Sequence, residues 1–299
     1  MRSKNLGQIP GLAEKFTKEV SLEVFKKMCV ARFFELNAKK AYEDKQINIP
    51  IYLSLGQEAI SAALAVSFPK PYIFAQYRSH DLYLAYGGKP MALVDELLSK
   101  PTGVAGGMGG SAAFHGPDIG MFGSDTLVGD HIPIAVGFAL GKNEKTLATL
   151  GDAAAEEDYV LGAMAYAPQK KLPILFVCYD NDLAILTETK VRRSWRVVDV
   201  AKAFGMEAVE ITDDPWLVMH HVTQLSQKLP AVLNIHTVRH LWHTGAGTDG
   251  PPEWNRFQMV KDEFNRLGWA KEAHDIEQSA EEEVKGWWTK AIAEKVKPQ

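Results

Sequence analysis

The chain has 299 residues, of which 46% are hydrophobic and 23% are charged, and its formal net charge is −4. A chain of this length and balance buries a sizeable core, as one large domain or two small ones. The slight negative charge disfavours general nucleic-acid binding. The longest mostly apolar run, residues 59–68, is too short to span a bilayer.

The two cysteines, Cys29 and Cys178, are too few for a disulfide framework. The first ten residues lack the apolar core of a signal peptide. Both observations favour a cytoplasmic protein with no membrane association.

The first part of the chain is expected to be helical after a short arm. Residues 1–17 are expected to form a mobile arm, and the apolar spacing over 18–42 predicts one amphipathic helix. Gly56 allows a turn, and Glu58 suits the first turn of a second helix.

A strand over residues 72–75 ends at a polar cluster that contains Tyr77, Arg78 and His80. An arginine matches a phosphate group by paired hydrogen bonds, and a tyrosine adds a hydroxyl group. A Tyr-Arg pair alone is also compatible with an ordinary surface.

Residues 103–129 hold nine glycines, more than a helix or a strand interior tolerates. We therefore expect a long folded loop, followed by a helix over 131–140.

The stretch 145–185 predicts a βαβ unit. An apolar run over 146–150 stops at Gly151, and a second run over 173–178 stops at an Asp-Asn-Asp cluster. Residues 160–167 between them are expected to form the crossover helix, so the two strands are parallel.

The two strand ends carry the groups with the clearest chemistry. Asp152 and Asn181 each come just past a strand, and the carboxyl ends of parallel strands meet at one edge of the sheet. Carboxylate and amide oxygens suit Mg²⁺ or Ca²⁺. The turn Gly151–Ala154 offers backbone N–H groups to phosphates. The competing interpretation is an ordinary βα turn in which Asp152 caps the helix.

The last third of the chain holds one further candidate, His243, in a Gly/Pro-rich segment at 239–252. This segment follows the last strand and is expected to be a mobile loop over the strand ends. His243 is either a proton shuttle or an exposed loop histidine. Arg192 and Arg193 are expected as a solvated or interface pair. The remaining elements are a strand over 208–211 and helices over 197–204 and 253–299.

Taken together, these segments resemble the α subunit of the decarboxylating component of 2-oxo acid dehydrogenase complexes, of the pyruvate, branched-chain and acetoin types. Residues 145–185 align without gaps to the family's signature for thiamine diphosphate and Mg²⁺, which is Gly-Asp-Gly followed by Asn-Asn. Ala153 replaces the third glycine, and Asp180 replaces the first asparagine. The resemblance implies the α/β thiamine diphosphate-binding fold, with a parallel sheet between helices, in a single domain over 1–299.

The resemblance also implies a site. Asp152, Asn181 and the backbone carbonyl of Leu183 would hold Mg²⁺. His243 falls on the cofactor-side histidine, and His80 falls in the family's Tyr-Arg-x-His, as a catalytic residue or a support for a loop or partner. The remaining implied cofactor contacts are Tyr77, Arg78, Thr126, Leu127, Val128, Gly151, Ala153 and Ala154.

Several positions depart from the family's pattern. Tyr52 stands where the pyruvate enzymes often have a histidine that contacts substrate, Ala113 replaces another histidine, and Thr126 replaces a glycine. After His243 the match fades.

The implied activity is decarboxylation of a 2-oxo acid with transfer of the acyl unit to a lipoyl-type acceptor. A β-like subunit would supply the pyrimidine-binding half and its glutamate, in a heterotetramer, and a lipoyl acyltransferase is a further expected partner. The alternatives are a related thiamine diphosphate enzyme acting on a sugar or specialised 2-oxo substrate, a non-catalytic scaffold subunit, and an unrelated βαβ phosphate binder.

Overall fold

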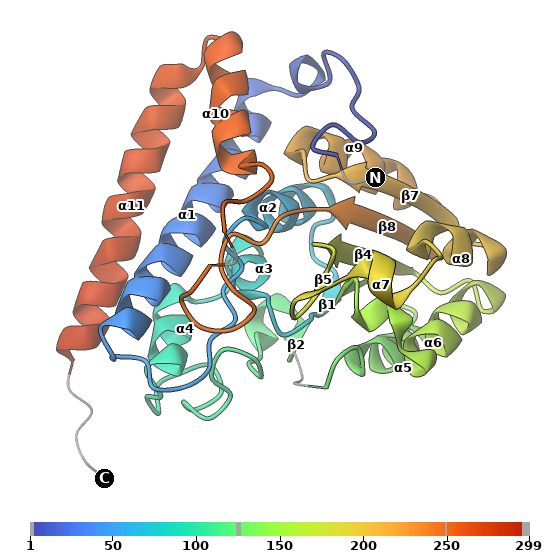
Figure 1. Ribbon diagram of the computed structural model, residues 1–299, viewed down its shortest axis with the longest axis horizontal. Coiled ribbons are helices and arrows are strands. Elements are labelled where there is room, and N and C mark those ends of the chain that lie inside the picture. Colours follow the sequence, from blue (N-terminus) through green and yellow to red (C-terminus); the bar gives the residue numbers. More distant parts are fainter. Residues whose placement is uncertain (1–2, 124–126, 249, 295–299) are drawn as a thin grey trace.

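The computed structural model describes residues 3–123, 127–248 and 250–294, and a six-stranded parallel sheet lies at its centre (Figure 1). The strand order is β2-β1-β3-β4-β8-β7. The strands of this sheet are β1 (Tyr72–Phe74), β2 (Met121–Phe122), β3 (Thr146–Gly151), β4 (Ile174–Asp180), β7 (Glu207–Thr212) and β8 (Ala231–His236). The expected class, α/β with a parallel sheet between helices, is confirmed.

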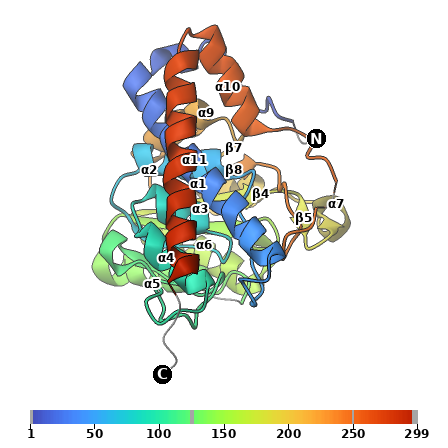
Figure 2. The same ribbon diagram turned by 90° about the vertical axis from the view of Figure 1, so that its left-hand side faces the viewer.

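Helices cover both faces of the sheet. One face packs against α1 (Lys18–Glu43), α2 (Glu58–Ser67), α3 (His80–Ala85), α4 (Pro90–Leu97), α9 (Pro215–Leu225), α10 (Arg256–Arg266) and α11 (Ala270–Ala293). The other face packs against α5 (His131–Lys142), α6 (Asp158–Gln169) and α8 (Val197–Ala203). Helix α11 lies along the outside of α1 (Figure 2).

Burial on two faces explains why the central strands are apolar throughout. Along β4, Leu175 and Val177 point into one hydrophobic core, while Phe176 and Cys178 point into the other. Successive side chains of a strand point to opposite faces, so a strand between two helical layers needs apolar residues at every position.

The predicted βαβ unit is present as β3, α6 and β4. The second strand continues two residues beyond the predicted end, so Asp180 belongs to β4 and Asn181 is the first residue after it. Strand β2 was not predicted. It consists of two residues within the glycine-rich segment that pair with β1, which is too short a run to give a strand pattern in the sequence. In the ranges that the structure describes, we find no helix with the length and hydropathy needed to cross a membrane.

The N-terminal segment, expected as a mobile arm, packs onto the body from residue 3 onward. The Leu6 carbonyl accepts a hydrogen bond from the Thr212 amide at 3.0 Å, and Arg256 donates to the Lys4 carbonyl at 2.8 Å. Leu12 and Ala13 are buried in the core. The segment therefore extends the packed surface beside β7.

Candidate active site

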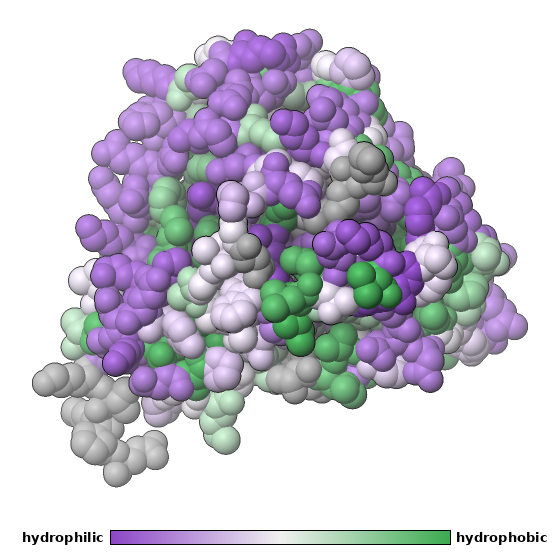
Figure 3. Space-filling view, viewed as in Figure 1, coloured by the Kyte–Doolittle hydropathy of each residue, from purple (hydrophilic) through white to green (hydrophobic). Residues whose placement is uncertain are grey.

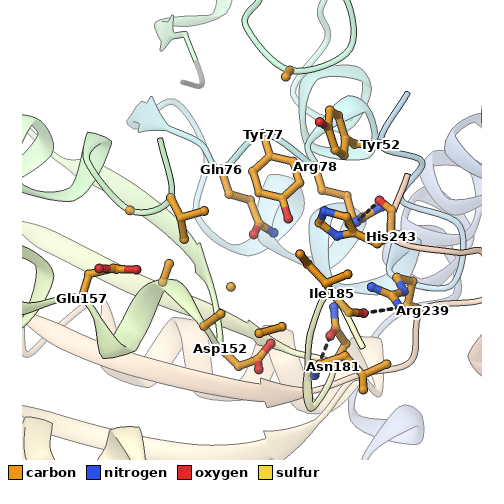
Figure 4. A pocket seen from close by; sticks show the side chains of 18 of the residues that line it. Tyr52, Gln76, Tyr77, Arg78, Asp152, Glu157, Asn181, Ile185, Arg239 and His243 are labelled. Carbon is orange, nitrogen blue, oxygen red and sulfur yellow. Dashed lines mark hydrogen bonds between the residues drawn. The ribbon is translucent and has the colours of Figure 1, made fainter. Parts of the chain in front are cut away.

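A cavity of about 320 Å³ lies at the carboxyl ends of the central strands (Figure 4). Its walls come from the segments that follow four strands: 76–78 after β1, 151–154 after β3, 181–185 after β4, and 239–243 after β8. Ligands of open parallel sheets bind at this edge, and the volume suits a small molecule.

Asp152 is the buried carboxylate of this cavity, with 2% of its surface exposed. Its Oδ2 atom accepts hydrogen bonds from the Arg192 guanidinium and from the Thr189 hydroxyl, the latter at 3.3 Å. Burial raises the pKa of Asp152 to about 6, with a further contribution from the Asp180 carboxylate, while Arg192 acts in the opposite direction. Burial and the Asp180 charge therefore outweigh the effect of Arg192 on this group, and a cation bound nearby would favour the ionised carboxylate.

Arg192 reaches this carboxylate from the short helix α7 (Thr189–Arg192). It also donates to Glu156 at 2.6 Å, and Arg193 pairs with the same Glu156 at 3.2 Å. The two arginines are therefore ion-pair partners within the chain, and the expectation of a solvated pair is wrong. The chain after β4 turns back toward the end of β3 and brings both arginines to Glu156. No local pattern in the sequence predicts this turn.

Asn181 and Leu183 lie beside Asp152 on the cavity wall. The Asn181 Oδ1 atom accepts a hydrogen bond from the Leu183 amide at 3.1 Å (Figure 4). Within the described ranges, no cluster of three or more His, Cys, Asp or Glu side chains suits a metal ion. A cation here would depend on carboxylate, amide and backbone oxygens, which fits the hard-donor preference of Mg²⁺. The magnesium site stays a prediction.

Arg78 supplies positive charge to the opposite wall. Its guanidinium is 4% exposed and donates to the carbonyls of Leu53 and His243, at 2.7 Å and 2.8 Å. Burial lowers the pKa of Arg78 from its ordinary value. Both of these bonds go to neutral acceptors, so the charge remains available to an anion in the cavity. A diphosphate fits this wall, where Tyr77 also lies.

Three rings gather at one end of the cavity. Tyr52 packs against Tyr77 with 4.9 Å between ring centroids, and His243 lies 5.8 Å from Tyr52 and 6.2 Å from Tyr77. His243 is thus brought to the cavity, as predicted from the sequence (Figure 4).

The segment 127–129 forms another part of the wall. Leu127 and Val128 line the cavity, and the Val128 carbonyl accepts a hydrogen bond from the Tyr159 hydroxyl. At Gly129, φ is +85° and a Cβ atom would come within 2.7 Å of Val160, so only glycine fits this turn. Thr126 lies outside the described residues.

His80 does not line the cavity, and its surroundings agree with the alternative expectation, support for a loop. Its ring is fully buried, with Nδ1 3.1 Å from Glu35 and Nε2 3.0 Å from the Ser111 hydroxyl. Ser111 Oγ in turn accepts from the Tyr52 amide at 2.8 Å. His80 therefore supports the segment that carries Tyr52, which makes it a positioning residue.

The structure adds lining residues that the sequence did not single out. Gly151, Ala153 and Ala154 line the cavity as predicted. The additional lining residues with polar or large side chains are Gln57, Gln76, His131, Glu157, Ile185 and Arg239. They come from six separate segments, so no spacing in the sequence connects them.

The family model described as "Dehydrogenase E1 component" matches residues 26–297. The α-2 subunit of the mitochondrial pyruvate dehydrogenase E1 component of Arabidopsis thaliana is 27% identical over 95% of this chain and 75% of its own length. The testis-specific α subunit of Rattus norvegicus is 29% identical over 80% of this chain and 63% of that protein.

Solved transketolase structures share the fold. The enzyme of Campylobacter jejuni superposes with a TM-score of 0.59 at 15% identity, and a mutant from Pichia stipitis with a TM-score of 0.55 at 14% identity. Each superposition covers 92% of this chain, which spans about half of each transketolase chain, 49% and 48% respectively. At this identity the similarity concerns the fold alone.

Proposed function

We propose that this chain, which belongs to the dehydrogenase E1 component family, is the subunit that binds thiamine diphosphate and Mg²⁺ in an enzyme that decarboxylates a 2-oxo acid. The acyl unit would pass to a lipoyl-type acceptor. The observation that carries the proposal is the buried Asp152 carboxylate, which faces Asn181 and Leu183 across neighbouring strand ends.

The residues of this chain would bind and orient the cofactor. Asp152, Asn181 and the Leu183 carbonyl would hold the cation, and Tyr77 and Arg78 would hold the diphosphate. Thiamine diphosphate, when bound, would supply the nucleophilic carbon and the electron sink for decarboxylation. The aromatic end of the cavity would exclude water from the reacting carbon.

A β-like subunit would complete the enzyme by supplying a pyrimidine-binding half and its glutamate. Leu127 and Ile185 line the cavity and are exposed, and Leu186 and Val191 are exposed apolar residues that follow Ile185 in the chain; the exposed fractions of the four are 57–71%. Figure 3 shows apolar surface on this side of the molecule. Exposed apolar side chains of this size suit burial against another protein chain. A two-α, two-β assembly is the expected form, with a lipoyl acyltransferase as a further partner.

A related thiamine diphosphate enzyme outside the dehydrogenase complexes is the second candidate. Tyr52 favours it, because a phenol ring takes the place of a histidine beside His243. A lipoyl-acceptor assay separates the two, since only the first candidate reduces a lipoyl group.

The test is calorimetric titration of thiamine diphosphate with Mg²⁺, into the chain alone and into its complex with the β-like partner. We expect binding that Asp152→Ala abolishes and that Asp275→Ala, a matched change at an exposed position, leaves intact. Absence of binding in both wild-type preparations would contradict the proposal and favour a non-catalytic scaffold subunit.

A further inference from the structure

The side chain of Gln57 presents an unexplained polar group on the cavity wall. Only 1% of the residue surface is exposed. Neither its Nε2 nor its Oε1 atom has a hydrogen-bond partner among the described residues, although the residue lines the cavity. An unpaired buried polar atom loses its hydrogen bonds to water without gaining others, so an amide with two such atoms is expected to have a partner that is not part of the chain.

The backbone holds this amide in place. Gly56, directly before it, has a φ of +103°, and a Cβ atom there would come within 2.4 Å of the Val238 carbonyl. The backbone N–H of Gln57 donates to the Ser54 carbonyl at 3.0 Å, and the backbone carbonyl of Gln57 accepts from the Ile60 N–H at 3.1 Å. The turn is therefore fixed against the segment after β8, and rotation of the backbone does not bring the side chain to other partners.

The chemistry of a primary amide narrows the class of ligand. Nε2 donates and Oε1 accepts, so a group that satisfies both must accept one hydrogen bond and donate another. A carboxylate only accepts and a methyl group does neither, whereas a hydroxyl group does both. The neighbouring Tyr52 leads into the same turn and lies with His243 at the aromatic end of the cavity.

We propose that Gln57 determines substrate specificity by binding a hydroxyl group of the substrate, next to its 2-oxo carbon. The preferred substrate is then a hydroxylated 2-oxo compound rather than its deoxy counterpart. This inference rests on the proposed function, because it assumes decarboxylation or cleavage at a 2-oxo group in this cavity. Gln57 belongs neither to the residues proposed to bind the cation nor to those proposed to bind the diphosphate.

The experiment uses the full chain assembled with its β-like partner and loaded with thiamine diphosphate and Mg²⁺. The substrates are 3-hydroxypyruvate and pyruvate, which differ by one hydroxyl group, with an artificial electron acceptor. We expect the wild type to favour 3-hydroxypyruvate in kcat/KM by at least about tenfold, which is the discrimination that one hydroxyl-binding group supplies. Gln57→Leu should bring the ratio close to one and leave the cofactor Kd within about twofold.

Two further variants keep the result interpretable. Gln57→Glu retains the shape of the side chain if the leucine variant fails to fold, and it should also lower the ratio because it removes the donor. Gln278→Leu makes the same change on the exposed surface of α11 and should alter neither the ratio nor the cofactor Kd. Should the loaded complex turn over neither substrate, ligand-detected NMR measures the two dissociation constants instead, and the wild type should bind 3-hydroxypyruvate more tightly than pyruvate while Gln57→Leu should not.

The cofactor titration distinguishes failure of the proposed function from failure of the proposed role of Gln57. If the wild-type complex does not bind thiamine diphosphate, the proposed function fails and the role of Gln57 fails with it. If the cofactor binds and the wild type does not favour 3-hydroxypyruvate, only the role of Gln57 is overturned. An unchanged ratio in Gln57→Leu with a tenfold weaker cofactor Kd would assign the amide to the cofactor instead.

Discussion

Two buried carboxylates in this protein have opposite surroundings. Glu96 on α4 is fully buried, and its two oxygens accept four backbone N–H hydrogen bonds, from Ala105, Gly107, Gly109 and Gly110, at 2.7–2.9 Å. Asp152 is buried almost as deeply, yet its hydrogen bonds come from two side chains and reach one oxygen. The chain therefore completes the surroundings of Glu96 and leaves those of Asp152 open toward the cavity.

The difference separates a structural carboxylate from one available to a ligand. Glu96 fixes the glycine-rich loop, where a Cβ atom on Gly109 would come within 1.7 Å of the Ala113 carbonyl. This loop carries Ser111, which holds Tyr52 in place. Asp152 instead retains a pKa raised to about 6 by burial, so folding alone does not satisfy its charge.

The largest expected effect comes from removing the structural carboxylate. Glu96→Ala leaves four backbone N–H groups without an acceptor and should lower the free energy of unfolding by roughly 3–5 kcal/mol. Asp152→Ala is the matched variant and should lower it by less than about 1 kcal/mol, because it also removes a poorly compensated buried charge. Urea denaturation of the cofactor-free chain measures both values. Equal losses in the two variants would remove the distinction between the two carboxylates.

Asp81, a third buried carboxylate, should make stability depend on pH. Its Oδ2 atom accepts from the Ser61 hydroxyl at 2.6 Å, while Oδ1 has no partner among the described residues. Burial raises the pKa of Asp81 from 3.8 to about 7. Above pH 4 the unfolded chain binds fewer protons at this group than the folded chain, so its contribution falls as the pH rises toward 7.

Asp81→Asn should therefore gain stability relative to the wild type between pH 4 and pH 7, by up to roughly 4 kcal/mol. Urea denaturation at intervals across this range gives the difference, with Asp262→Asn, an exposed position, as the control. A difference that is constant with pH would mean that Asp81 is ionised in the folded protein throughout.

The smallest expected effect concerns the guanidinium that partly compensates Asp152. Arg192→Ala should destabilise the cofactor-free chain by roughly 1–2 kcal/mol, because one partly buried ion-pair partner is lost. The increase in Tm on addition of thiamine diphosphate and MgCl₂ should then exceed that of the wild type, since a cation no longer competes with the guanidinium for Oδ2.

Arg196→Ala serves as the control. Arg196 lies directly before α8 and forms ion pairs with Asp199 and Glu210 at the surface. A smaller ligand-induced increase in Tm for Arg192→Ala than for this control would show that Arg192 contributes to ligand binding rather than opposing it.

The sequence predicted the parts of the site that follow from local pattern. Two short apolar runs and the helix between them predicted β3, α6 and β4, and thereby placed Asp152 and Asn181 at the same edge of the sheet. Strand and helix periodicities depend on neighbouring residues only, and the parallel arrangement follows from the right-handed crossover. Tyr77, Arg78 and His243 follow other strands, and the resemblance to the family assigned them to the same site, where the structure places them on the cavity wall.

Tertiary structure alone decided the partners of the polar groups. The ion pair of Arg192 joins positions 40 residues apart, and the hydrogen bond between His80 and Glu35 spans 45 residues. Whether a histidine faces a cavity or a carboxylate depends on how helices pack across the sheet, and no local spacing encodes that packing. For the same reason the sequence predicted a helix that starts near Glu58, directly after Gln57, and only the fold left the side-chain amide of Gln57 buried without a partner among the described residues.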